Sequence, residues 1–316
     1  MSRLAIGLDL GGTQVRGALV DAAGTIHART DARTATSGGA DVVIAQLIAA
    51  ARSVAAGVAA ERIVGVGVSS PGPLDTETGV TLGLPSIAGF VDVPLRDKLA
   101  DLLGLPVTLE NDGIAAAVGE WRHGAGIGLR HLVYVTVSTG IGGGVIADGR
   151  VLRGRRGLAG HVGHLAIVKD GVRCNCGNPG CWEAYGAGPA FERRAREQVA
   201  ASPASSLAAA APLDARAVFA AAAAGDRLAL SLVAEEADIL GVGMVSLLHL
   251  YSPQRIIVGG GLANSFDLLL PGIMARIASD AMPAFRDVPV VRAALGGNSG
   301  LVGAAALAFE SVSRKG

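Results

Sequence analysis

The three cysteines of this 316-residue chain, Cys174, Cys176 and Cys181, all lie within eight residues, and His164 lies ten positions upstream of the first. Three thiolates and one imidazole form the closed tetrahedral ligand set of a structural zinc ion. Glycine and proline residues before Cys181 let the chain turn tightly enough for both ends of the loop to face one ion. Reduced cysteines also occur as small core residues, but such a cluster in an otherwise cysteine-free chain is poorly explained that way. The spacing therefore favours a zinc-bound loop.

Length and composition predict two domains, each with a sizeable core, because half of the 316 residues are apolar. Lysine plus arginine equals aspartate plus glutamate at 27 each, so no basic excess indicates a nucleic-acid partner. No apolar run approaches the length of a membrane span, and Asp9 comes too early for a signal-peptide core. Three thiols needed for metal imply a reducing compartment, so the expected location is cytoplasmic.

A first glycine turn joins two short β-type runs, residues 4–10 and 15–20. The turn, Gly11-Gly12-Thr13, offers backbone N–H groups and a hydroxyl to an anion. Asp9, just before it, is a carboxylate that can hold Mg²⁺ through water. Such turns also make ordinary hairpins, so this signal alone is weak.

A second glycine turn repeats the pattern, since residues 138–144 contain Thr139 and Gly140 and lie between the runs 132–137 and 145–149. Two hydroxyl-bearing hairpins far apart in the chain indicate an internal duplication that clamps phosphates. The pair resembles the actin-like ATPase (ribonuclease H-like) fold, in which two α/β domains enclose a nucleotide.

The remaining segments alternate between helical and strand patterns. Gly72 follows a buried strand at residues 63–68, a position where α/β folds bind ligands. Gly259, Gly260 and Gly261 follow another strand at 256–258, where a turn can cover a nucleotide base or ribose. Amphipathic or alanine-rich patterns predict helices at 41–57, 94–103, 114–121, 189–201, 213–224, 226–251 and from about 300 to 310.

Asn111 and Asp112 directly precede the helix predicted at 114–121. An Asn-Asp pair there is often only a helix N-cap. The alternative is a general base aimed at a substrate. Without other information, an Asn-Asp pair at this position is more often a helix cap than a catalytic site. The same pair can serve both as a cap and as a general base.

The segment Gly160-His161-Val162-Gly163-His164, followed by Cys174-x-Cys176-Gly-x-x-Gly-Cys181-x-Glu183, resembles the zinc motif of the ROK family, which contains repressors and sugar kinases. The resemblance covers essentially the whole chain. It implies that His164, Cys174, Cys176 and Cys181 bind a structural zinc, and that His164 and Glu183 also contact sugar hydroxyls. It further implies that Asn111 holds the sugar, that Asp112 takes the proton of the attacking hydroxyl, and that the protein is a homodimer.

The resemblance also implies two α/β domains around a cleft, residues 1–118 plus 300–316 and residues 119–299. Residues expected to bind Mg-ATP are Asp9, Gly11, Gly12, Thr13, Thr139, Gly140, Gly259, Gly260 and Gly261. Residues expected to bind sugar are Gly72, Asn111, His161, His164 and Glu183. The implied reaction is ATP-dependent phosphorylation of a hexose or N-acyl hexosamine at the C6 hydroxyl, with Asp112 as the base.

Two positions depart from the commonest family pattern. His161 stands where most members have glutamate, and Pro85-Ser86 stands where many have Pro-Asn. The Gly-His-x-Gly-His pattern is closest to bacterial N-acetylmannosamine kinases, so N-acetylmannosamine is the expected substrate. Glucokinase is the alternative. A non-catalytic sugar-responsive regulator is the alternative from another functional class. ROK repressors add an N-terminal helix-turn-helix, whereas here the strand that precedes the first glycine turn begins at Leu4, which argues against a repressor.

Overall fold

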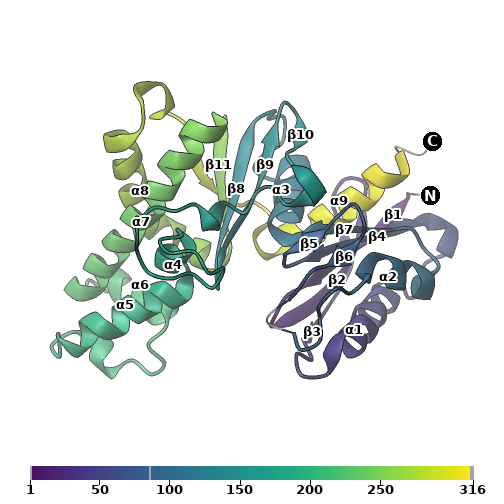
Figure 1. Ribbon diagram of the computed structural model, residues 1–316, viewed down its shortest axis with the longest axis horizontal. Helices are drawn as coiled ribbons and strands as arrows, with labels where there is room; N and C mark the ends of the chain where they lie inside the picture. Colours follow the sequence, from purple (N-terminus) through teal and green to yellow (C-terminus); the bar gives the residue numbers. More distant parts are fainter. Residues whose placement is uncertain (1, 85–86, 314–316) are drawn as a thin grey trace. The chain divides into compact units, whose positions relative to one another are not determined.

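The computed structural model describes residues 2–84 and 87–313, so Pro85 and Ser86 lie outside the described residues. The chain forms two compact units (Figure 1). Unit 1 comprises Met1–Arg130, Gly144–Gly160 and Ala294–Gly316, and unit 2 comprises His131–Gly143 and His161–Ala293.

These bounds differ from the expected domains, because residues 119–130, 144–160 and 294–299 lie in unit 1. The reason is the close packing of α3 (Asp112–His123) against α9 (Ser299–Ser313). A Cβ atom on Gly119 would lie 2.3 Å from the carbonyl oxygen of Ser299, so the two backbones touch. The whole of α3 therefore stays with the terminal helix.

The sheet of unit 1 has the strand order β3-β2-β1-β4-β7. Its strands are β1 (Leu4–Leu10), β2 (Gln14–Asp21), β3 (Ile26–Arg33), β4 (Ile63–Ser70) and β7 (Val107–Asn111). The predicted hairpin of β1 and β2 is confirmed, and β4 and β7 run parallel to β1. β3 was not predicted, because this edge strand carries mostly polar, partly exposed residues. The short strands β5 (Leu74–Asp75) and β6 (Val80–Thr81) form a separate ribbon.

Helices cover both faces of this sheet. On one face α1 (Gly39–Val54) and α2 (Leu95–Leu103) share a core with the larger side chains of β1 and β4. On the other face α9 lies against small residues. Cβ atoms on Gly7 and Gly67 would lie 2.1 and 1.7 Å from the carbonyl oxygens of Leu301 and Ala304. Glycine at these two positions therefore lets the helix backbone rest directly on the strands.

The second sheet has the order β10-β9-β8-β11-β12. Its strands are β8 (Leu132–Val137), β9 (Ile141–Ala147), β10 (Arg150–Val151), β11 (Arg255–Gly259) and β12 (Val290–Arg292). β8, β11 and β12 are parallel. The helices of unit 2 are α4 (Glu183–Gly186), α5 (Gly188–Ala200), α6 (Ala215–Ala223), α7 (Arg227–Tyr251) and α8 (Phe266–Asp280), and α7 contacts the other four.

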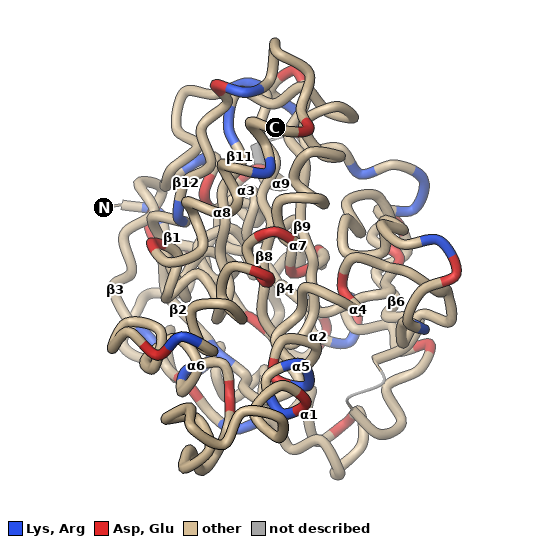
Figure 2. The backbone as a smooth tube through the Cα atoms, turned by 90° about the vertical axis from the view of Figure 1, so that its left-hand side faces the viewer, with Lys and Arg blue, Asp and Glu red and all other residues tan. Residues whose placement is uncertain are grey.

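Short 3₁₀ turns link these elements, at Ala60–Arg62, Arg155–Gly157, Val162–His164, Ser206–Ala209, Gly261–Ser265, Pro283–Phe285 and Gly296–Asn298. Within residues 2–84 and 87–313, no single helix is long and apolar enough to cross a membrane. Among the described helices, only α6 and α7 together pass that test, and they are bent by 117° at the break between them. Positive and negative residues are interspersed along the chain (Figure 2).

Candidate functional site

Asp9 lies near the end of β1 with its carboxylate held by two donors. The residue is 6% exposed, and the Ser69 hydroxyl donates to its Oδ1 at 2.7 Å. The Arg16 guanidinium donates to Oδ2 through Nε at 2.9 Å and through a second nitrogen. The adjoining turn presents Gly12 and Thr13 to solvent. Since each carboxylate oxygen already accepts a bond from the protein, Asp9 is oriented before any metal ion arrives.

Asn111 and Asp112 occupy the junction between β7 and α3. Asn111 is the N-cap, because its Oδ1 accepts from the backbone nitrogens of Gly113 and Ile114 at 3.0 and 3.4 Å. Asp112 is the first residue of the helix, so the N-cap and the predicted base are different residues. Burial, with a smaller contribution from the charge of Asp9, raises the pKa of Asp112 to about 6. A carboxylate with this pKa is mostly ionised at neutral pH and still a competent proton acceptor.

Register explains why these groups meet at one edge of the sheet of unit 1. Asp9 pairs with Ser69 of β4, and Ser69 pairs in turn with Glu110 of β7. The three strands are parallel, so their carboxyl ends lie together, which is where α/β sheets bind ligands. Gly72, two residues beyond β4, lies in the loop at this edge.

In unit 2 the carboxyl ends of β8 and β11 bring the two other predicted nucleotide turns together. The turn after β8 is closed by a bond from the nitrogen of Ser138 to the oxygen of Gly140 at 2.9 Å and exposes Thr139. The turn after β11 places Gly260 at a φ of 87°, where a Cβ would lie 2.4 Å from the oxygen of Val137. Gly260 and Gly261 are exposed. Only glycine allows this approach of one turn to the other.

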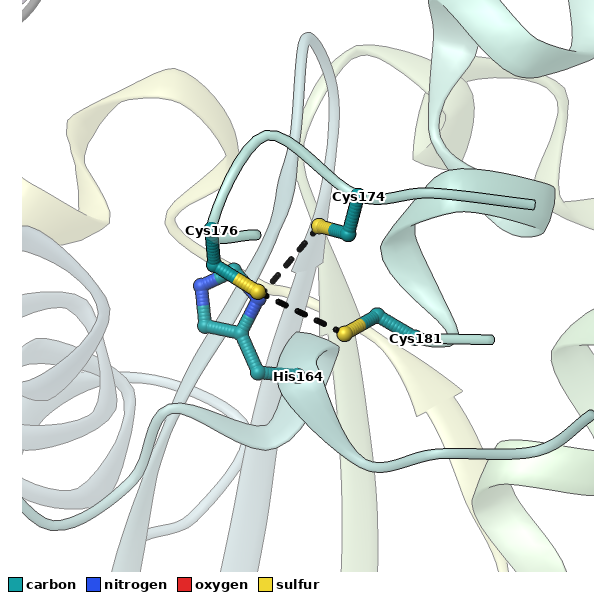
Figure 3. A group of neighbouring side chains, drawn as sticks. All are labelled: His164, Cys174, Cys176 and Cys181. Atoms are coloured by element: carbon teal, nitrogen blue, oxygen red, sulfur yellow. Dashed lines mark hydrogen bonds between the residues drawn. The ribbon is translucent and has the colours of Figure 1, made fainter. Parts of the chain in front are cut away.

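The predicted zinc ligands form one cluster (Figure 3). The donor atoms of His164, Cys174, Cys176 and Cys181 all lie within 4.8 Å of one another. Cys174 Sγ lies 3.7 Å from His164 Nδ1, and Cys176 Sγ lies 3.6 Å from Cys181 Sγ. Donors placed tetrahedrally at zinc distances are about 3.5–3.8 Å apart. These residues therefore fit a closed zinc site, with Nδ1 as the ligand atom of the histidine.

The chain between the cysteines supports this geometry. Gly177 and Gly180 have φ values of 94° and 81°, and Cys174 donates its N–H to the oxygen of Asn178 at 2.8 Å. Burial, together with the neighbouring thiols, raises the pKa of Cys181 to about 12. A thiol with a raised pKa stays protonated unless a cation binds beside it, and a zinc ion at this cluster would supply that charge.

Two further residues expected to contact sugar, His161 and Glu183, lie beside the cluster. The His161 ring is exposed, with its centroid 6.1 Å from that of His164. Glu183 begins α4 and is half-buried. Its Oε1 lies 3.6 Å from Cys174 Sγ, and its Oε2 accepts the N–H of Ile141 at 2.9 Å. Polar atoms on three segments of unit 2 therefore converge next to the zinc ligands.

The structure thus gathers the predicted residues in two groups, one in each unit. Unit 1 holds Asp9, Gly11, Gly12, Thr13, Gly72, Asn111 and Asp112, and unit 2 holds Thr139, Gly140, His161, His164, Cys174, Cys176, Cys181, Glu183, Gly259, Gly260 and Gly261.

Sequence reasoning missed three charged residues in unit 1. Arg16 stands opposite Asp9 in the β1–β2 register, so the hairpin pattern could have revealed it. Glu110, 2% exposed beside Asn111, pairs with Arg153 at 3.0 Å. No local pattern predicts this contact, because the partners are 43 residues apart.

Comparisons with known proteins agree on one family. The ROK family model matches residues 5–311. A glucokinase of Halalkalibacterium halodurans is 34% identical over 306 residues, covering 94% of this chain and 92% of that protein. An N-acetylmannosamine kinase of Citrobacter koseri is 35% identical over 310 residues, covering 98% of this chain and 99% of that protein.

Among solved structures, a ROK family glucokinase from Streptomyces griseus, in complex with glucose and AMPPNP, matches with a TM-score of 0.85. It is 34% identical, and the match covers 97% of this chain and 99% of that one. The predicted two-domain actin-like ATPase fold is thereby confirmed. From residues 5 to 311, this chain belongs to the ROK family.

Proposed function

We propose that this protein transfers the γ-phosphoryl group of ATP to the C6 hydroxyl of a hexose or N-acyl hexosamine, and that N-acetylmannosamine is its preferred substrate. The observation that carries the proposal is the pair of carboxylates at one sheet edge of unit 1. Asp9 is fixed by Arg16 and Ser69, while Asp112 has its pKa raised to about 6. The glucokinase and N-acetylmannosamine kinase relatives support the reaction class.

In the proposed reaction Asp112 accepts the proton of the C6 hydroxyl as its oxygen attacks the γ-phosphorus. A new P–O bond forms to the sugar, the bond from the γ-phosphorus to the β–γ bridging oxygen breaks, and ADP leaves. With a pKa of about 6, roughly 90% of Asp112 is ionised at pH 7 and ready to act. Asn111 would hold the sugar beside it.

Magnesium, when bound, would neutralise charge on the phosphates. Asp9 would hold it through water, since both carboxylate oxygens already accept bonds from protein donors. The turns bearing Thr13 and Thr139 would bind phosphate oxygens, and Gly259, Gly260 and Gly261 would lie at the adenosine.

Zinc would have a structural role, because its four protein ligands leave no coordination position for substrate. With Nδ1 of His164 on the metal, the other ring nitrogen is available to a sugar hydroxyl. Glu183 and Gly72 would complete the sugar contacts.

His161 supports the choice of N-acetylmannosamine. A glutamate at this position accepts hydrogen bonds from two adjacent hydroxyls, which glucose offers at C2 and C3. A neutral histidine has one donor and one acceptor nitrogen, so it can donate to an amide carbonyl, which an ionised carboxylate cannot. The exposed ring of His161 is free to turn toward such a group.

Glucokinase activity is the second candidate, since glucokinase relatives reach a similar identity. A non-catalytic regulator is the third. Purified protein with Mg-ATP and N-acetylmannosamine, N-acetylglucosamine, glucose, mannose, fructose or allose would separate these functions. A kinase releases ADP with at least one sugar and none with 6-deoxyglucose, which lacks the accepting hydroxyl. Sugar binding without ADP release would instead indicate a regulator.

We also infer a homodimer in the cytoplasm. The dimer follows the family, and a reducing compartment would keep the three thiols available to zinc. Light scattering on the purified protein tests the dimer.

A further inference from the structure

The zinc-binding segment of unit 2 also supports the turn after β8. Glu183 Oε2 accepts the N–H of Ile141 at 2.9 Å, immediately after that turn. Gly188, which follows α4, donates its N–H to the oxygen of Ser138 at 2.8 Å. The turn is therefore tied at both ends to the chain that follows the zinc ligand Cys181.

Close backbone approaches strengthen this link. A Cβ on Gly140 would lie 2.5 Å from Glu183 Oε2, and one on Gly163 would lie 2.0 Å from the oxygen of Ile141. One on Gly143 would lie 2.8 Å from a methyl group of Val162. The segment between His161 and His164 thus packs against the start of β9 so closely that neither Gly143 nor Gly163 has room for a side chain.

The backbone that carries Glu183 is itself held in place. Glu183 Oε1 lies 3.6 Å from Cys174 Sγ, a contact without a hydrogen bond when Cys174 is a zinc-bound thiolate, and the preceding Trp182 is fully buried. The Trp182 indole donates to the oxygen of Ile239 in α7 at 3.0 Å, and its backbone N–H donates to Leu165 at 2.8 Å. A short stretch of chain therefore runs from the predicted zinc ligand Cys181 through Trp182 to Glu183, whose carboxylate accepts the N–H of Ile141.

We propose that Glu183 is a positioning residue for the phosphate turn at Ser138–Gly140, and that zinc acts through it on nucleotide binding in the absence of sugar. This inference rests on the proposed function, in which that turn binds phosphate. If Glu183 served sugar alone, nucleotide affinity without sugar would not depend on it. Its bond to Ile141 predicts that it does.

Glu183→Ala removes the acceptor of the Ile141 N–H, whereas Glu183→Gln keeps an amide oxygen that can accept it. Calorimetry with Mg²⁺ and a non-hydrolysable ATP analogue, without sugar, should show binding weakened roughly tenfold in the alanine variant. The glutamine variant should lose less than about threefold. Glu197→Ala, on the exposed side of α5, is the matched control and should bind like the wild type.

Hydrogen exchange in the peptide spanning residues 138–146 gives a readout independent of any ligand. Exchange should accelerate in Glu183→Ala and in Cys176→Ser, which removes the exposed zinc ligand, but not in Glu197→Ala. Zinc content and thermal unfolding of Glu183→Ala check that the fold and the metal are retained.

The outcomes separate the two claims. If the wild type binds the nucleotide and Glu183→Ala binds it equally, with unchanged exchange, the inference is wrong and the kinase proposal stands. If the wild type binds no nucleotide, the kinase proposal fails, while faster exchange in Glu183→Ala would still support the structural link.

Discussion

Replacing Asp112 with asparagine should make the protein slower and more stable at the same time. The amide keeps an oxygen that can accept the Gly113 N–H, which Asp112 Oδ1 accepts at 2.8 Å, and Asn111 remains the cap of α3. It cannot take a proton from a hydroxyl. We therefore expect turnover to fall by about 10²- to 10⁴-fold, the usual contribution of a general base.

The stability gain follows from the raised pKa. An aspartyl pKa shifted from 3.8 to about 6 means that ionised Asp112 disfavours the folded state by about 3 kcal/mol at most. This cost is absent below pH 3.8, where the carboxyl is protonated in both states, grows between pH 3.8 and 6, and is constant above. The asparagine side chain carries no charge at any pH, so the variant should gain up to about 3 kcal/mol at pH 8 and nothing at pH 3.5.

Urea unfolding at both pH values measures the gain, and the pH dependence of kcat/KM tests the base. In the wild type kcat/KM should fall below about pH 6 as Asp112 is protonated, and this limb should disappear in Asp112→Asn. Asp101→Asn, at an exposed aspartate of α2, is the control and should change neither. Near wild-type turnover in Asp112→Asn would remove this residue from the mechanism, and lower stability at pH 8 would refute the electrostatic account.

Three further substitutions test other parts of the structure. Cys176→Ser should lower the zinc content, measured by elemental analysis, from one ion per chain to well below one. Wild-type protein that contains no zinc after expression in zinc-supplemented cells would contradict the metal site. His161→Glu should raise kcat/KM for glucose relative to kcat/KM for N-acetylmannosamine. An unchanged ratio would mean that His161 does not determine sugar specificity. Glu120→Ala should lower the free energy of unfolding by about 3–5 kcal/mol in urea titrations, because it removes the acceptor of three backbone N–H groups and the Ser299 hydroxyl. A loss below about 1 kcal/mol would mean that water replaces the carboxylate.

Local patterns predicted the hairpins and most helices well. The β1–β2 hairpin follows from glycines between two apolar runs, and α7 was expected at 226–251 and spans Arg227–Tyr251. The cluster of His164 with the three cysteines could also be predicted, because the spacing of these residues is local. β3 was not predicted, since an edge strand with polar side chains lacks the alternation of apolar and polar residues that indicates a strand.

Contacts between distant segments were beyond sequence reasoning. Glu120 lies in the helix predicted at 114–121, and nothing in that pattern indicates that it is fully buried and accepts bonds from residues 294 and 295. The bond from Ile141 to Glu183 joins residues 42 positions apart. Neither contact has a periodic signal, because tertiary packing alone brings the partners together. Asn111 and Asp112 were singled out from the sequence, but only the backbone geometry shows that Asn111 is the cap and Asp112 the first helical residue.

The comparison of kcat/KM for N-acetylmannosamine and glucose, measured by ADP release from Mg-ATP with purified zinc-loaded protein, tests the central claim most directly. The proposed roles of Asp112 and His161 predict catalytic phosphorylation with a higher kcat/KM for N-acetylmannosamine. A higher value for glucose would contradict the sugar assignment, and no ADP release with either sugar would contradict kinase activity toward both.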